Sequence, residues 1–171
     1  FVWRCMIIKI PNKYKVLYIV GKIYPSNGGI QRHVIELSKY FRKKYEVKII
    51  TAFHQGQSKP ARDSNFNKNG IDVKYFGAYA SSGIRILKNP FDIVELIKEI
   101  NSSDIVHMHH VSFLFFWTSL ICFILRKKVI FTTMGLIFHT KKMIIIKKIV
   151  YIFLKLIISR FSFVIAISKS D

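Results

Sequence analysis

The sequence has 171 residues, 51% of them hydrophobic, and its 28 Lys and Arg against 9 Asp and Glu give a formal net charge of +19. This length suits one domain with a sizeable core, and the apolar content excludes a largely disordered chain. The positive charge favours a phosphate-bearing partner, but it does not choose between nucleic acid, anionic lipid and a nucleotide.

The two cysteines, Cys5 and Cys122, have no metal-type spacing, which indicates a reducing compartment and predicts a cytoplasmic location. The opening residues FVWRCMIIKI lack the apolar core of a signal peptide. The chain does not start with Met and ends shortly after Ser168, which has the pattern of a helix N-cap. We therefore expect a piece of a longer protein.

Short, β-rich apolar runs recur along the chain and predict strands. In chain order they are Lys15–Val20, Tyr45–Ala52, Ile71–Gly77, Ser103–His109, Lys128–Thr133 and Phe161–Ser168. Nearly continuous apolar strands are typical of a sheet that is covered on both faces. The third run alternates polar and apolar residues, which predicts an edge strand.

Helical patterns separate most of these strands, at Ile30–Arg42, at Asn89–Ile100 and at residues 111–126 and 140–159. The second helix starts with an Asn suited to capping and a Pro in the first turn. Alternating strands and helices predict an α/β fold with a doubly wound, Rossmann-like parallel sheet. Ligands of such sheets bind at the carboxyl ends of the strands, so the residues that follow each strand are the candidates for function.

A glycine pair, Gly28 and Gly29, stands between the first strand and the first helix. Glycine lets the backbone approach a ligand closely, and a helix N-terminus offers free N–H groups that suit a phosphate or a sugar hydroxyl. Arg32 and His33 follow in the first turn. A simple flexible turn remains the alternative, and neither G-x-G-x-x-G nor the Walker pattern is present.

Three histidines, His107, His109 and His110, mark the end of the fourth strand. Alternation places His107 and His109 on one face of the sheet. No further ligand can be assigned, so no metal site is predicted. We expect His107 to be a packed, hydrogen-bonded core residue, and His109 and His110 to contact substrate.

Four motifs occur in an order and spacing that resemble the N-terminal domain of family 4 glycosyltransferases of GT-B architecture. They are YPSNGGIQRHVIELSKYF, YEVKIITA, DIVHMHH, and the pair VIFTTMGLIFHT and FVIAISKSD. The resemblance covers nearly the whole chain from Lys15. It implies that Gly28 and Gly29 face the interdomain cleft near the donor diphosphate and the acceptor, with Arg32 and His33 beside them.

The same resemblance implies that His109 and His110 line the acceptor side of the cleft. It also implies a substrate-contacting loop after the fifth strand, with Gly135 in a tight turn and His139 as its second histidine. Met134 stands where the family usually has a donor-binding His, and a thioether cannot hydrogen-bond comparably. His139 is a candidate to replace it.

By resemblance, the parent protein moves a sugar from a nucleotide-sugar donor to a lipid-linked or saccharide acceptor, with retention and without a metal cofactor. The domains expected are an N-terminal extension at residues 1–14 and an acceptor-side Rossmann-like domain at residues 15–171. No Glu pair has the family's E-x7-E spacing, so the donor-binding domain is expected to lie outside this chain. The chain alone is then predicted to be inactive, and no catalytic residue is assigned.

Two segments raise the question of a membrane. Val111–Leu125 carries no charge but is shorter than the roughly 20 residues of a spanning helix, which favours a buried crossover helix. In residues 141–159, Lys141, Lys148 and Lys155 form one narrow stripe on an otherwise apolar helix. A helix with so wide an apolar face is either buried in the protein or rests on a bilayer. Because family members often use lipid-linked acceptors, we expect peripheral contact with the anionic cytoplasmic face of a membrane, and burial remains the alternative.

Two other functions stay open from the residues alone. The charge suits a basic nucleic-acid-binding domain, although the lysines are scattered and no RNA- or DNA-binding module is recognisable, so no nucleic-acid partner is predicted. The apolar segments suit a small membrane-anchored protein.

Overall fold

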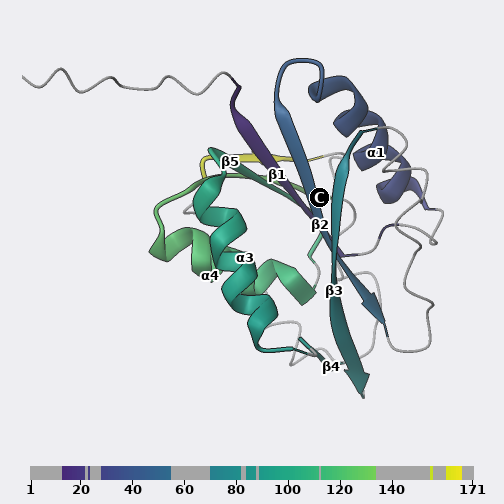
Figure 1. Ribbon diagram of the computed structural model, residues 1–171, viewed down its shortest axis with the longest axis vertical. Coiled ribbons are helices and arrows are strands. Elements are labelled where there is room, and N and C mark those ends of the chain that lie inside the picture. Colours follow the sequence, from purple (N-terminus) through teal and green to yellow (C-terminus); the bar gives the residue numbers. More distant parts are fainter. Residues whose placement is uncertain are drawn as a thin grey trace, which may run out of the picture.

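The computed structural model describes residues 13–21, 23, 28–54, 70–81, 84–87, 89–111, 113–133, 155 and 161–166. Within these residues one seven-stranded sheet has the order β4-β3-β2-β1-β5-β6-β7 (Figure 1). The strands are β1 (Lys15–Val20), β2 (Glu46–His54), β3 (Asp72–Ser81), β4 (Ile84–Leu87), β5 (Ile105–His109), β6 (Lys128–Thr132) and β7 (Phe163–Ile165). Every neighbouring pair is parallel except β3 and β4.

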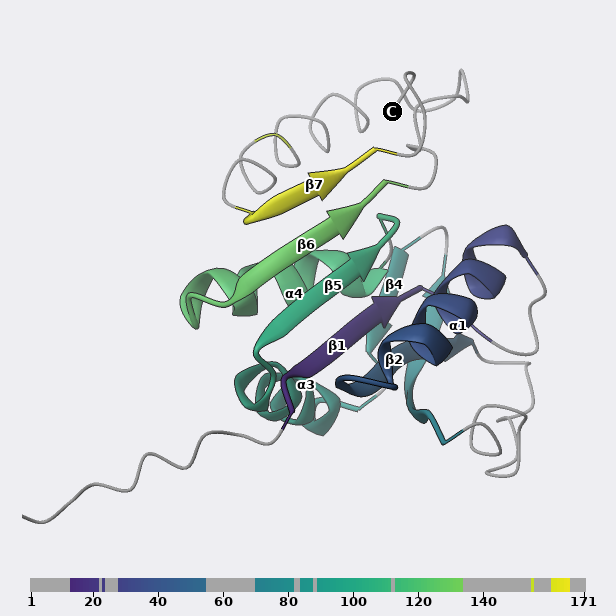
Figure 2. The ribbon, with the colours of Figure 1, turned by 90° about the horizontal axis from the view of Figure 1, so that it is seen from above.

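Three described helices cover the two faces of the sheet. Helix α1 (Gly29–Phe41) packs on one face, and α3 (Phe91–Ser102) and α4 (Phe113–Ile124) pack on the other (Figure 2). This arrangement confirms the doubly wound α/β prediction. The predicted Asn cap is also present, because the Asn89 side-chain oxygen accepts the Phe91 N–H at 3.0 Å. The helix predicted at 140–159 lies outside the described residues except for Lys155.

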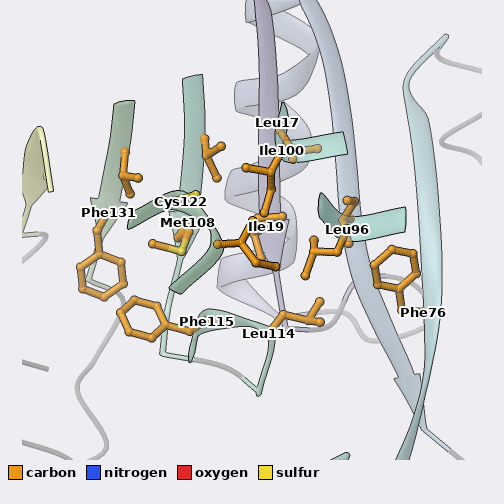
Figure 3. Packing of buried hydrophobic residues seen from close by; sticks show 14 of the residues in the cluster. Leu17, Ile19, Phe76, Leu96, Ile100, Met108, Leu114, Phe115, Cys122 and Phe131 are labelled. Carbon is orange, nitrogen blue, oxygen red and sulfur yellow. The ribbon is translucent and has the colours of Figure 1, made fainter. Parts of the chain in front are cut away.

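Alternation along the central strands divides the core into two layers. In β1, Leu17 and Ile19 point to the face of α3 and α4, where Met108, Phe115 and other buried apolar side chains fill the space (Figure 3). The intervening residues Val16, Tyr18 and Val20 join the layer beneath α1. A strand buried on both faces needs apolar residues at nearly every position, and this explains the continuous run KVLYIV.

The third strand is not at the edge, and that prediction was wrong. Strand β4 pairs with β3 from Ala78↔Leu87 to Ser81↔Ile84 and lies outside it. Four residues are too few to show a clear strand period, so the pattern did not predict β4.

An ion-pair network fixes α3 to strands β2 and β3. Lys48 Nζ lies 2.6 Å from Glu99 Oε1, and Lys74 pairs with both Glu99 and Glu95. Burial would raise the pKa of the Glu99 carboxyl, but its hydrogen bonds and charge interactions with Lys48 and Lys74 together outweigh burial and hold that pKa below its usual value. The acidic side of α3 is therefore turned toward the sheet.

Helix α4 is a crossover helix, as predicted, but only its inner side is buried. Leu114 and Phe115 are buried in the core, whereas Trp117, Leu120 and Ile124 are exposed. Within the described residues, no helix combines the length and apolarity that crossing a bilayer requires.

Candidate functional site

The order of the strands identifies where a ligand would bind. Strands β1 and β5 are neighbours, but the chain leaves β1 toward β2 and β3 and leaves β5 toward β6 and β7. The connections after these two strands therefore diverge, and a doubly wound sheet binds ligands at the crevice that this divergence opens. The end of this pair is the register Val20↔His109, which we call the β1–β5 rim.

The glycine pair starts α1 at this rim. Gly28 is the N-cap with an extended backbone (φ −128°, ψ 171°), and its carbonyl accepts the Arg32 N–H at 3.1 Å. Gly28 supplies no side-chain cap, and the first turn has no acidic residue. A Cβ on Gly28 would meet the Gln31 side-chain oxygen at 2.5 Å, whereas a Cβ on Gly29 would meet none of the other described residues within 4 Å. Among the described residues, the backbone at Gly29 is therefore the part of this helix start that an anionic group could approach.

Aromatic and imidazole rings from three elements meet just below the rim. The rings of His107 and His109 stack with centroids 4.1 Å apart, and Tyr18 lies 5.3 Å and 5.4 Å from them. His33, from the first turns of α1, meets His109 edge-on at 5.9 Å. We call these four residues the imidazole cluster. It joins α1, β1 and β5, so the sequence was right to place His33 and His109 at one edge of the sheet.

His109 occupies the centre of the imidazole cluster and is fully buried. Neither of its ring nitrogens has a hydrogen-bond partner within the described part of the chain. Burial, followed by the nearby His107 and His33, lowers the pKa of His109 to about 2. The imidazole is therefore neutral at physiological pH and holds one N–H donor and one acceptor in an apolar surrounding.

His107 is the packed, hydrogen-bonded core histidine that the sequence predicted. Its Nε2 lies 2.8 Å from Thr132 Oγ1 on the neighbouring strand β6. Burial, with a smaller effect from His33, lowers its pKa to about 4. The pair of rings is thus anchored to β6 through His107.

His110 turns the chain away from the end of β5. It has a left-handed backbone (φ 65°), and its N–H donates to the Thr132 carbonyl at 3.1 Å. A non-glycine residue in this region is strained by about 1 kcal/mol. The side chain is half-buried beside the rim, whereas Arg32 and His33 are exposed on α1.

The structure thus brings Gly28, Gly29, His33, His109 and His110 to one rim. Whether these residues bind substrate stays a prediction. Met134, Gly135 and His139 lie outside the described residues. Within those residues, no group of three or more His, Cys, Asp or Glu side chains could hold a metal ion.

Sequence reasoning missed two members of this region. Tyr18 was read only as part of an apolar strand, and Thr132 only as the end of another. Tyr18 shares the face of His107 and His109 because β1 and β5 pair in register, with Tyr18 opposite His107. The pairing order was the missing information, and the sequence pattern does not contain it.

Comparison with known proteins agrees with the resemblance. The family model described as Glycosyltransferase Family 4 matches residues 27–171. A search of curated proteins found no match to this chain. One similar solved structure is that of a protein assigned as a UDP-N-acetylglucosamine 2-epimerase from Listeria monocytogenes, with a TM-score of 0.50 and 15% sequence identity.

The alignment covers 92% of this chain and 39% of that protein, so the chain spans well under half of its structural relative. At this identity the likeness concerns the fold, and it supports a Rossmann-like half of a GT-B architecture. The family match covers the helix with the glycine pair, the histidine-bearing strand and the later strands of the same sheet. The chain therefore belongs to Glycosyltransferase Family 4.

Proposed function

We propose that this chain is the acceptor-side domain of a glycosyltransferase, which moves a sugar from a nucleotide-sugar donor to a lipid-linked or saccharide acceptor with retention. The observation that carries the proposal is the rim itself. A helix N-terminus whose Gly29 backbone is approached by no other described residue lies next to a buried neutral histidine at the switch point of the sheet. Because the chain belongs to a glycosyltransferase family, sugar transfer is the reaction to test at the β1–β5 rim.

In this proposal the first amides of α1 stabilise the diphosphate of the donor. Transfer breaks the bond between the anomeric carbon and the diphosphate oxygen and forms one to an acceptor hydroxyl oxygen. The acceptor proton leaves with the diphosphate. Negative charge grows on the leaving group as the bond breaks, and N–H donors aimed at that charge lower the barrier. No metal ion is required by this scheme.

His110 and the imidazole cluster would act on the acceptor side. Because His109 is neutral, it adds no positive charge beside the anomeric carbon. The exposed His33 ring beside it is the member of the imidazole cluster that a sugar hydroxyl could reach. His110 follows His109 at the same rim with a left-handed backbone, and such strain is common where a residue is held for function.

The donor-binding half is proposed to lie outside this chain. The chain matches 39% of its structural relative, and no Glu pair in it has the family's E-x7-E spacing. We therefore propose that the chain alone does not transfer sugar. We also propose that the whole protein acts on the cytoplasmic face of a membrane, where a lipid-linked acceptor would be available.

The test is Gly29→Ala in the whole protein that carries this chain, assayed with a panel of UDP- and GDP-sugars by release of the nucleoside diphosphate. A methyl group at this position meets none of the other described residues within 4 Å, so the variant should fold normally. It would meet a ligand lying on the helix amides, so kcat/KM should fall by about tenfold, equal to about 1.4 kcal/mol.

Tyr40→Ala serves as the control, because Tyr40 is exposed near the far end of the same helix. Its kcat/KM should remain at the level of the unmodified protein. If Gly29→Ala also keeps full activity, the donor does not lie on the amides of α1 and the proposed site is wrong.

A further inference from the structure

Two successive threonines hold the end of strand β6 to both of its neighbours. The Thr132 side chain is buried, and its Oγ1 lies 2.8 Å from Nε2 of His107 on β5. The Thr132 carbonyl accepts the His110 N–H at 3.1 Å. On the other side, the Thr133 N–H donates to the Ile165 carbonyl of β7 at 2.9 Å. The position of Thr132 is therefore set from both sides, so it can serve as an anchor for the residues that it contacts.

Thr132 is the inner end of a series of contacts that leads to the β1–β5 rim. Its hydrogen-bond partner His107 stacks on His109, with ring centroids 4.1 Å apart. His109 in turn meets His33 edge-on at 5.9 Å. His33 is exposed on α1, whereas Thr132, His107 and His109 are buried. A change at the buried Thr132 hydroxyl can therefore be passed through two imidazoles to an exposed one.

The hydrogen bond between His107 and Thr132 is not needed to hold the two strands together. The backbones of β5 and β6 already pair in register from Ile105↔Lys128 to His109↔Thr132. Two apolar side chains of the same shape would be about as stable, because a buried hydrogen bond gains little over an apolar contact. The hydrogen bond adds direction, since an imidazole nitrogen bonds well only when its ring points at the partner. It therefore orients His107 more than it stabilises the sheet.

We propose that Thr132 is a positioning residue for sugar transfer, which holds the exposed His33 ring toward the acceptor hydroxyl through His107 and His109. Without the Thr132 hydroxyl, His107 Nε2 would lose its partner while it remains buried, and a buried polar atom without a partner is costly. The His107 ring would turn toward another partner or toward water. The stacked His109 ring would have to shift with it. A small displacement of a group that positions a substrate lowers the rate of reaction.

The role of Thr132 rests on the proposed sugar transfer, so the experiment has one part without substrate and one part with it. If the whole protein consumes no sugar nucleotide, the proposed function fails, but the response of the His33 ring still decides whether Thr132 positions it. The matched control for both parts is Thr118→Val. Thr118 is also buried, it lies on α4 on the opposite face of the sheet, and its hydroxyl has no hydrogen-bond partner among the described residues.

The first part follows the histidine rings by NMR in the whole protein with isotope-labelled histidine. His33→Gln and His107→Phe identify the signals of these two rings by their loss. Thr132→Val keeps the shape of the side chain but removes the hydroxyl, so it should shift the ring signals of both His107 and His33. Thr118→Val should shift neither. An unchanged His33 signal in Thr132→Val would overturn the proposal.

The second part measures transfer by the whole protein, with the best donor of the sugar-nucleotide panel and octyl glucoside as the acceptor probe. Thr132→Val should lower kcat/KM for octyl glucoside by about tenfold, while KM for the donor stays within about twofold. Thr132→Ser keeps a hydroxyl and should recover most of the loss. If Thr132→Ser does not restore the rate, or if Thr118→Val lowers it equally, Thr132 only supports the fold and the proposal is wrong.

His107→Phe tests whether the effect passes through His107, since phenylalanine keeps a flat ring but has no nitrogen that could bond Thr132. In that background Thr132→Val should change kcat/KM by less than about twofold, because the contact that it removes is already lost. An undiminished effect would mean that Thr132 acts by another route, and the proposal would fail. Thermal melting sets an assay temperature at which every variant is folded.

Discussion

The two faces of the sheet are built from the same strands, yet they differ in what their alternate residues do. On the face of α1, Tyr18 and two histidines stand among apolar neighbours and reach toward the rim. On the face of α3 and α4, the strands contribute Leu17, Ile19, Met108 and similar side chains, and the interior is mostly apolar, with Thr118 and Ser119 of α4 buried in it. One face holds buried imidazoles near the proposed site, and the other, which we call the cohesive face, provides most of the apolar packing.

This difference indicates how a small domain separates function from stability. Because side chains alternate across a strand, one residue can take part in the site while its neighbour packs the core. In β5, His109 lies in the imidazole cluster and Met108 packs among α4 and the neighbouring strands. Buried histidines that lack hydrogen-bond partners lower the free energy of unfolding, and the apolar packing on the opposite face offsets that loss. Three predictions test the comparison.

The largest effect of a single substitution should come from the cohesive face. Leu114→Ala removes a fully buried side chain of α4 from the packing seen in Figure 3 and should lower the free energy of unfolding by about 3 kcal/mol. Leu120→Ala, the same change on the exposed side of the same helix, should alter it by about 0.5 kcal/mol or less. Urea unfolding monitored by circular dichroism measures both, and equal losses would show that the two sides of α4 pack alike.

The second prediction concerns acid and the face of α1. His107 and His109 have pKa values lowered from 6.5 to about 4 and about 2, so the unfolded chain binds protons before the folded one does. Stability is therefore complete above pH 6.5 and is lost as the pH falls, until the folded-state pKa of each group is reached. The loss approaches about 1.4 kcal/mol per pH unit for each histidine.

Urea midpoints between pH 7.5 and 4.5 measure this loss. Glu99 has a pKa below 4.5, so its own contribution is lost only under more acidic conditions. The double variant His107→Gln with His109→Leu should show a clearly shallower dependence over the same range. An unchanged slope would mean that other groups govern the acid sensitivity.

The smallest of the three effects concerns His109, and it tests whether a residue of the imidazole cluster lowers the stability of the fold. His109→Leu replaces an imidazole whose nitrogens lack partners among the described residues with an apolar group, and it should raise the free energy of unfolding by about 1 kcal/mol at pH 7.5. Sugar transfer by the whole protein should fall. His33→Leu, at an exposed position, is the control and should leave stability nearly unchanged. A large destabilisation by His109→Leu would show that its nitrogens are hydrogen-bonded in solution.

Much of the fold could be predicted because its signals are local. Strand β1 matches its predicted bounds, and α1 differs from its prediction by one residue at each end. The glycine pair at the start of α1 and the core role of His107 were also predicted from short patterns. The edge position of the third strand was wrong, because the four residues of β4 are too few to show a period.

By itself, the sequence determined the elements, their alternation, and hence a doubly wound sheet with its candidate residues after the strands. Tertiary structure alone decided that Tyr18 and His107 lie opposite each other, that His33 meets His109, and that α4 turns Thr118 inward and Trp117 outward. The physical reason is the distance along the chain over which the deciding contacts act. Helix and strand periods arise between residues a few positions apart, whereas strand order and helix docking depend on contacts between segments distant in the chain.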